Sequence, residues 1–171
     1  MTVFILQMML IMFSDKSIRK RSHVPNNFRQ TSIDKYIGII ANFFWLLALG
    51  YSIFLPLLFG SMWFYLGCII YLFGALLLLL ATFSFMTTPS NELIQKGVYS
   101  ISRHPMYLAT FLICLGTGIA TESFIMMLLS GIIFLCLYYE ASVEERYCNK
   151  IYKDFYKEYT DRVPRWLGLP K

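Results

Sequence analysis

Long runs of hydrophobic residues, separated by short polar segments, dominate this chain of 171 residues. Residues 37–59 and 62–89 carry no charge, and each run reaches the ~20 residues with which a helix crosses a bilayer. Residues 106–121 and 123–139 form shorter runs that predict a tight helical hairpin. Residues 1–13 indicate a short first span. The pattern predicts an all-α fold: a polytopic membrane helical bundle with about five spans and a C-terminal helix.

Proline and glycine residues predict where helices end. Pro56 should kink or end the helix formed by residues 37–59. The segment NELIQKG (91–97) is typical of one or two helical turns, which Gly97 would end in the left-handed conformation.

The stretch SRHPMYLA (102–109) places two cationic or titratable side chains at the start of an apolar run. Pro105 suits the first turn of a helix, so Arg103 and His104 lie at the N-terminal end of that helix. Free N–H groups and the helix dipole favour an anion there, and both side chains strengthen that field. The simpler alternative is that Arg103 anchors the helix at the membrane surface and His104 caps it.

The charged residues are distributed unevenly. The chain has 15 Lys and Arg against 10 Asp and Glu, a net charge of +5, which taken alone is compatible with nucleic-acid binding. However, every Lys and Arg lies in residues 14–36, 87–105 or 140–171. Five spans place these three segments on one side and leave only Glu122 among charged residues on the other, which is the positive-inside pattern. We therefore predict a multi-pass membrane protein in contact with the lipid bilayer and not with nucleic acid, its N-terminus outside and its C-terminus cytoplasmic.

Small residues inside the apolar runs indicate packing and not chemistry. The cysteines show no CxxC or Cys/His spacing, so we predict no metal site. Gly116 and Gly118 follow no strand, which argues against a phosphate loop and favours close contact between helices. The cysteines are Cys68, Cys114, Cys136 and Cys148.

A second polar cluster follows the last apolar run. Glu140 and Glu144 are four residues apart and share a helical face, with Glu145 beside them. The hairpin brings them opposite Arg103 and His104, on neighbouring helices whose axes lie ~8–10 Å apart. A zwitterion such as S-adenosylmethionine would fit this gap, with its carboxylate on the cations and its ammonium or hydroxyls on a glutamate. The alternative is a solvated face of charged side chains.

Beyond these glutamates, aromatic residues recur at helical spacing and predict a C-terminal helix that covers an apolar surface. Pro164 should end this helix, because the residue before a proline avoids the helical region. The aromatic residues are Tyr152, Phe155, Tyr156 and Tyr159.

Two segments, taken together, resemble a known superfamily. ELIQKGVYSISRHPMYLA (92–109) contains Gly-x-Tyr before Arg-His-Pro-x-Tyr, and EERYCNKIYKDFYKEYTDRVPRW (144–166) contains a Glu-Glu pair and a Tyr-x-x-Tyr…Val-Pro-Arg ending. In this order, around a short hairpin, they resemble the isoprenylcysteine carboxyl methyltransferase and phospholipid methyltransferase superfamily of integral-membrane enzymes. The resemblance implies one methyltransferase-like domain over residues 1–171, a catalytic region over 92–166, and S-adenosyl-L-methionine as methyl donor.

The charge clusters and the resemblance together predict roles for residues of both motifs. Arg103, Glu140 and Glu144 are the predicted catalytic residues. The acceptor would be a lipophilic or small molecule: an isoprenylcysteine carboxylate, a phospholipid or a thiol. The predicted donor-binding residues are Gly97, Tyr99, His104, Tyr107, Glu144 and Glu145.

Three positions depart from the superfamily pattern. Ala109 and Lys153 stand where glycine is usual. Glu140 stands where the carboxyl-methylating branch commonly has arginine, and a glutamate there would repel an anionic acceptor. If the nucleophile of the acceptor bears a proton, as in a thiol or an amine, Glu140 or His104 is a candidate general base.

Two other function classes stay open at the level of sequence. One is a membrane reductase of the steroid-reductase type, with similar late helices and a nicotinamide cofactor. The other is a non-enzymatic small transporter or assembly subunit. Transporters usually need an ionisable residue deep in a span, and no Asp, Glu, Lys or Arg lies deep in an apolar run here, which disfavours the transporter.

Overall fold

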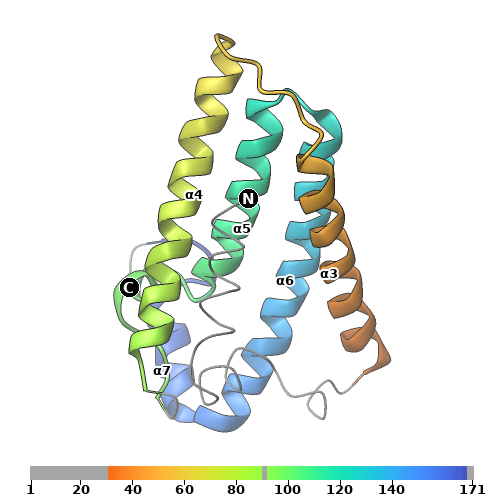
Figure 1. Cartoon of the computed structure of the whole chain (residues 1–171). Helices are drawn as coiled ribbons and strands as arrows, with labels where there is room; N and C mark the ends of the chain where they lie inside the picture. Colours follow the sequence, from red (N-terminus) through yellow and green to blue (C-terminus); the bar gives the residue numbers. More distant parts are fainter. Residues whose placement is uncertain (1–30, 90–91, 169–171) are drawn as a thin grey trace.

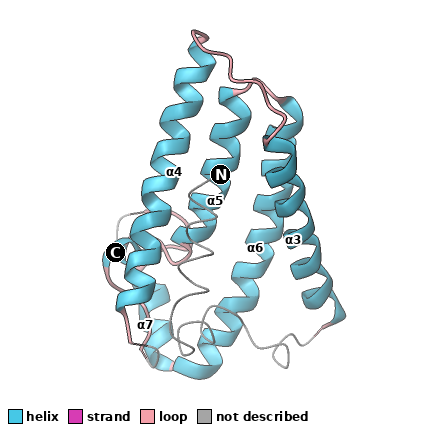
Figure 2. Ribbon diagram, in the orientation of Figure 1, coloured by secondary structure: helices cyan, strands magenta, loops and turns pink. Residues whose placement is uncertain are grey.

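The computed structural model describes residues 31–89 and 92–168. The predicted first span, residues 1–13, lies outside the described residues. Within them the chain is helical and contains no strand (Figure 2). The helices are α3 (Ser32–Ser52), α4 (Met62–Thr87), α5 (Pro105–Ala120), α6 (Phe124–Tyr152) and α7 (Asp154–Arg162), with one 3₁₀ helix, η2 (Gly97–Ser100).

The four longest helices stand side by side in the order α4, α5, α6, α3 (Figure 1). Helices α3, α4 and α6 are long and apolar enough to cross a membrane, and α5, with 16 residues, is shorter. Large hydrophobic side chains, such as Phe43 and Phe83, are exposed along α3 and α4, as expected of surfaces that face lipid. The described part of the chain is therefore a membrane-embedded helical bundle.

The hairpin of α5 and α6 forms as the apolar pattern predicts, and α6 continues beyond the apolar run of residues 123–139, as the predicted helical face shared by Glu140 and Glu144 requires. It starts after Ser123, whose side chain accepts a hydrogen bond from the N–H of Met126, and continues for 29 residues. The polar residues after 139 are good helix formers, so the end of the apolar run does not end the helix. Glu140, Glu144 and Glu145 therefore lie in the C-terminal half of one continuous helix.

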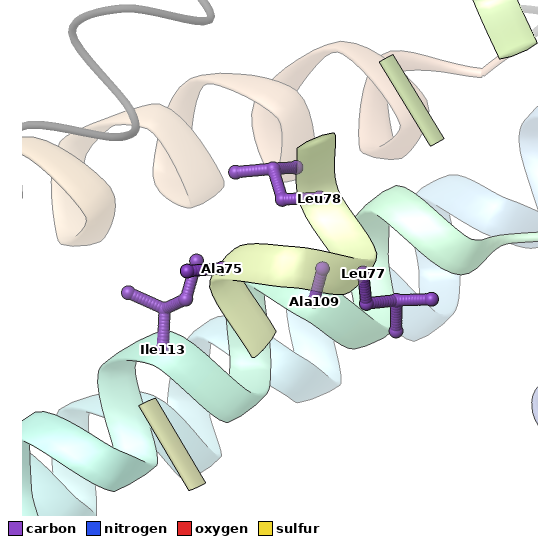
Figure 3. Close-up of a cluster of buried hydrophobic side chains, with 5 residues drawn as sticks. All are labelled: Ala75, Leu77, Leu78, Ala109 and Ile113. Carbon is purple, nitrogen blue, oxygen red and sulfur yellow. The ribbon is translucent and has the colours of Figure 1, made fainter. Parts of the chain in front are cut away.

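The closest packing in the bundle joins α4 to α5. Figure 3 shows Ala75 and Leu77 of α4 beside Ile113 and Ala109 of α5, and Leu78 belongs to the same buried cluster. At Gly116 a Cβ atom would lie 2.6 Å from the backbone nitrogen of Tyr71. The predicted role of this glycine in close helix contact is confirmed.

The predicted helical turns over residues 91–97 are wrong for the described residues of that segment. Residues 92–96 are irregular, and Gly97, with a φ of 62°, begins η2 instead of ending a helix. Ile94 is buried in a cluster with Ala81 and Tyr99. A segment this short is not helical by itself, so its tertiary packing decides its path.

The other predicted boundaries are confirmed. Helix α3 ends at Ser52, before Pro56, and α5 has Pro105 in its first turn. Helix α7 ends at Arg162, shortly before Pro164.

Helix α7 buries only part of its predicted aromatic stripe. Tyr156 and Tyr159 are buried with Val163, whereas Phe155 is 75% exposed. The hydroxyl of Tyr159 donates to the carbonyl oxygen of Tyr99 at 2.7 Å. These contacts attach α7 to the segment that precedes α5.

After α7 the chain runs back alongside the start of α5. The N–H groups of Arg103 and His104 donate to the carbonyl oxygens of Pro164 and Arg165 at 3.1 and 3.3 Å. This backbone pairing fixes the C-terminal segment, residues 163–168, beside the two cations of the first motif.

Candidate active site

His104 lies between the two glutamates of the second motif. Its Nδ1 is 3.4 Å from Oε2 of Glu144, and its Nε2 is 3.3 Å from Oε1 of Glu145. The imidazole is buried and makes no capping hydrogen bond to the helix that follows it. His104 occupies the N-cap position of α5, as the simpler alternative expects, but its side chain belongs to a cluster formed across α5 and α6.

Glu145 is the centre of this cluster. Its carboxylate is 3.1 Å from NH1 of Arg103 and accepts a hydrogen bond from Nε of Arg165 at 3.0 Å. A second guanidinium nitrogen of Arg165 donates to the other carboxylate oxygen. With His104 included, three cationic or titratable groups converge on one carboxylate whose side chain is only 12% exposed.

Tyr107 completes the contact with Glu144. Its hydroxyl donates to Oε1 of Glu144 at 2.5 Å. One helical turn after His104, its ring lies nearly parallel to the imidazole, with ring centroids 5.5 Å apart and planes 9° apart. This stacking limits rotation of the imidazole, so both of its nitrogens stay directed at carboxylates.

Two residues of the C-terminal segment belong to the site, and the sequence interpretation assigned them no role. The guanidinium of Arg165 lies 5.2 Å from the ring centroid of Tyr138, and its NH1 donates to the hydroxyl of Ser142 at 3.3 Å. Trp166 lies against the rings of His104 and Phe134, with centroids 6.2 and 5.1 Å apart. The signal in the sequence was the Val-Pro-Arg-Trp ending, whose Arg and Trp follow a predicted helix end.

The other predicted site residues are Glu140, Tyr99 and Gly97, and they lie in three different surroundings. Glu140 is buried one helical turn before Glu144. Tyr99 is buried between α4 and α7, where its backbone carbonyl binds Tyr159. Gly97 lines a cleft of about 410 Å³ with Ser84 and other residues of α4, and no residue of the cluster lines that cleft.

The electrostatics of the cluster favour a charged imidazole. Burial by itself would lower the pKa of His104, but hydrogen bonds and charge interactions with Glu144 and Glu145 outweigh it and raise the pKa above its ordinary 6.5. The predicted open gap between cations and carboxylates is instead closed by direct pairs. A zwitterion could replace such a pair, because its carboxylate can bind the cation and its ammonium group can bind the carboxylate.

One atom of the cluster fits an additional anionic ligand. Nε of Arg103 is buried and has no hydrogen-bond partner among the described residues. A buried donor of this kind is costly unless an acceptor meets it. A carboxylate group is a suitable acceptor. In the same part of the chain, no group of three His, Cys, Asp or Glu side chains has the geometry of a metal site.

The family model described as "Phospholipid methyltransferase" matches residues 57–154, more than half of the chain. The chain belongs to the phospholipid methyltransferase family, in agreement with the resemblance of its motifs.

Two curated relatives are similar to this chain over fewer than half of its residues. The "Protein-S-isoprenylcysteine O-methyltransferase" of Schizosaccharomyces pombe is 30% identical over 78 residues, which cover 45% of this chain and 33% of that protein. The "Cobalt-zinc-cadmium resistance protein CzcN" of Cupriavidus metallidurans is 32% identical over 79 residues, which cover 46% of this chain and 36% of that protein. The match thus spans about a third of the length of these relatives.

Proposed function

We propose that this protein transfers a methyl group from S-adenosyl-L-methionine to a lipophilic or small acceptor at the cytoplasmic membrane surface. The observation that supports the proposal most directly is the convergence of Arg103, His104, Glu144 and Glu145 at one end of the bundle. The family match supports methyl transfer over the reductase and transporter alternatives.

The cluster offers one group for each charge of the donor. The carboxylate of the donor's amino-acid part would bind Arg103, whose Nε is available, with His104 beside it. The ammonium or the ribose hydroxyls would bind Glu144, which is the more exposed of the two glutamates. The donor supplies an electrophilic methyl group, while the aromatic rings of Tyr107 and Trp166 shield the site from water.

The proposed chemical class of the methyl acceptor rests on Glu140. It lies one turn before Glu144 on the same face of α6 and is buried. A carboxylate at this position disfavours an anionic acceptor and can accept a proton from a thiol or an ammonium group. We therefore place isoprenylcysteine carboxylates below thiols and amines as acceptors. Glu140→Gln should leave donor binding intact and lower turnover by about 10²–10⁴-fold, and turnover within about twofold of wild type would remove this role.

The distribution of charge supports the orientation. The starts of α3 and α5 and the end of α6 lie together at one end of the bundle (Figure 1), and Lys35, Arg103 and Arg146 lie there. Glu122 lies at the opposite end, where it accepts a hydrogen bond from Ser61. We place the cluster and the C-terminus in the cytoplasm. Labelling of Ser100→Cys from outside intact cells, on a background without native cysteines, would contradict this orientation.

Transfer of labelled methyl groups tests the proposed activity. Membranes that contain the protein are incubated with methyl-labelled S-adenosyl-L-methionine and then extracted so that lipids, proteins and small volatile products are separated. The proposal predicts label in one fraction with wild type and none with His104→Gln at an equal amount of folded protein. Label that is equal for both proteins, or absent from every fraction with wild type, contradicts it.

A further inference from the structure

A second buried polar group joins α3 to α6 near the site. The carboxylate of Asp34 is 1% exposed. Its Oδ1 accepts hydrogen bonds from the hydroxyl of Tyr139 at 2.7 Å and from NH2 of Arg146 at 3.0 Å. Its Oδ2 accepts from the backbone N–H of Thr31 at 3.2 Å, and its own N–H donates to the hydroxyl of Thr31.

The two oxygens of Asp34 thus have separate tasks. Oδ2 belongs to the capping box that begins α3. Oδ1 accepts from Tyr139 and Arg146 of α6. A capping box needs no partner on another helix, so the second set of contacts requires a reason other than helix formation.

The position of these partners on α6 supplies that reason. Tyr139 and Arg146 flank the three glutamates in sequence. At ~3.6 residues per turn they lie within roughly 20° of each other around the helix axis, and the midpoint of Glu144 and Glu145 lies roughly 160° away. Asp34 therefore holds the back of α6 while the glutamate pair projects from its front toward His104.

We infer that Asp34 is a positioning residue that fixes the rotation of α6, so that Glu144 and Glu145 meet the cations of α5. This positioning should tighten the binding of S-adenosyl-L-methionine, an expectation that rests on the proposed function. The loss of the Asp34 contacts to α6 would let the helix rotate or shift, and the hydrogen bonds of the glutamate pair are lost with small displacements.

A pair of matched variants separates positioning from general stability. Tyr139→Phe/Arg146→Gln removes both contacts to α6 and leaves the capping box intact. Thr31→Ala removes the capping partner and leaves both contacts to α6. Asp34→Asn is a further variant in case the double variant does not fold: it keeps one acceptor oxygen, replaces the other with an amide NH2 group, and loses the ion pair with Arg146.

Two readouts are measured in detergent on the full chain. The first is the Kd of S-adenosyl-L-methionine by calorimetry. The second is the emission of Trp166 on a Trp45→Phe/Trp63→Phe background, because the Trp166 ring lies against Phe134 and Tyr138 of α6. We expect the double variant and Asp34→Asn to weaken donor binding about tenfold and to shift the emission. Thr31→Ala should change neither, and Tyr139→Phe/Arg146→Lys should recover most of the affinity.

The outcomes distinguish this inference from the proposed function. Unchanged emission and Kd in the double variant, or equal changes in Thr31→Ala, would overturn the positioning role. If wild type does not bind the donor at all, the proposed function fails, while a shift of the emission confined to the Asp34, Tyr139 and Arg146 variants still supports the positioning of α6.

Discussion

Arg165 and Glu145 meet through two hydrogen bonds although they are 20 residues apart in the chain. The pair connects the C-terminal segment to the end of α6. It also places a third cationic side chain on the carboxylate that already binds Arg103 and His104. The C-terminal segment is therefore part of the candidate site and not a tail beyond it.

We expect Glu145→Gln to destabilise the folded protein strongly. The variant removes the charge that offsets Arg103, His104 and Arg165 at a side chain that is only 12% exposed, and the loss of one partner of such a group costs about 3 kcal/mol. Thermal unfolding in detergent measures the change. Glu158→Gln is the matched control: its carboxylate makes an exposed pair with Arg162 at 3.8 Å, worth no more than about 0.5 kcal/mol. Equal midpoints for the two variants would contradict the central role of Glu145.

The raised pKa of His104 predicts a pH dependence of stability. Its folded-state pKa lies above the ordinary 6.5, so the folded protein holds the proton more tightly than the unfolded chain. The stabilisation is complete below about pH 6.5 and is lost as the pH rises through the folded-state pKa. The thermal unfolding midpoint of wild type should therefore fall as the pH rises from about 6.5 through the folded-state pKa of His104. A His104→Gln variant should lose that fall, and an identical slope in both proteins would be evidence against a charged imidazole.

The sequence predicted the helical elements and the pairing of the two motifs well. The apolar runs and Pro105 determine α3, α4 and α5, since the length of a run and the preference of proline for a first turn are local properties. The approach of His104 to the glutamates followed from the hairpin topology. These predictions needed no knowledge of how side chains pack.

The features that the sequence did not predict depend on contacts between distant segments. The irregular path of residues 92–96 follows from burial of Ile94, and the position of Arg165 follows from backbone pairing with His104. The contact of Asp34 with Arg146 joins residues 112 positions apart. No periodicity in a single segment contains such information.

The contact between α4 and α5 predicts opposite effects for two glycine substitutions. In Gly116→Ala the new Cβ would meet the backbone of Tyr71 at 2.6 Å, and such overpacking costs about 1–3 kcal/mol. A methyl group added to Gly131 on α6 would have no atom within 4 Å, so Gly131→Ala should stabilise the helix by about 0.5–1 kcal/mol. Unfolding midpoints of both variants check the prediction. A neutral or stabilising Gly116→Ala would mean that the helices do not pack this closely.

Lys153 offers a stabilising substitution. It joins α6 to α7 with a φ of 47°, a backbone conformation that favours glycine, and glycine is the usual residue at this position of the superfamily. Lys153→Gly should raise the unfolding free energy by about 1 kcal/mol, whereas Lys150→Gly, inside α6, should lower it by about 1 kcal/mol. If both variants lower the unfolding midpoint, the junction does not have the positive φ.

Binding of S-adenosyl-L-methionine to the purified protein in detergent is the decisive experiment for the proposed donor site. Calorimetry should be carried out on wild type, His104→Gln and Glu144→Gln, with Glu158→Gln as the surface control. We expect saturable binding to wild type and to Glu158→Gln, and at least tenfold weaker binding, about 1.4 kcal/mol, to each of the other two. No binding to folded wild type, or equal affinity in all four proteins, would show that the cluster does not hold the donor.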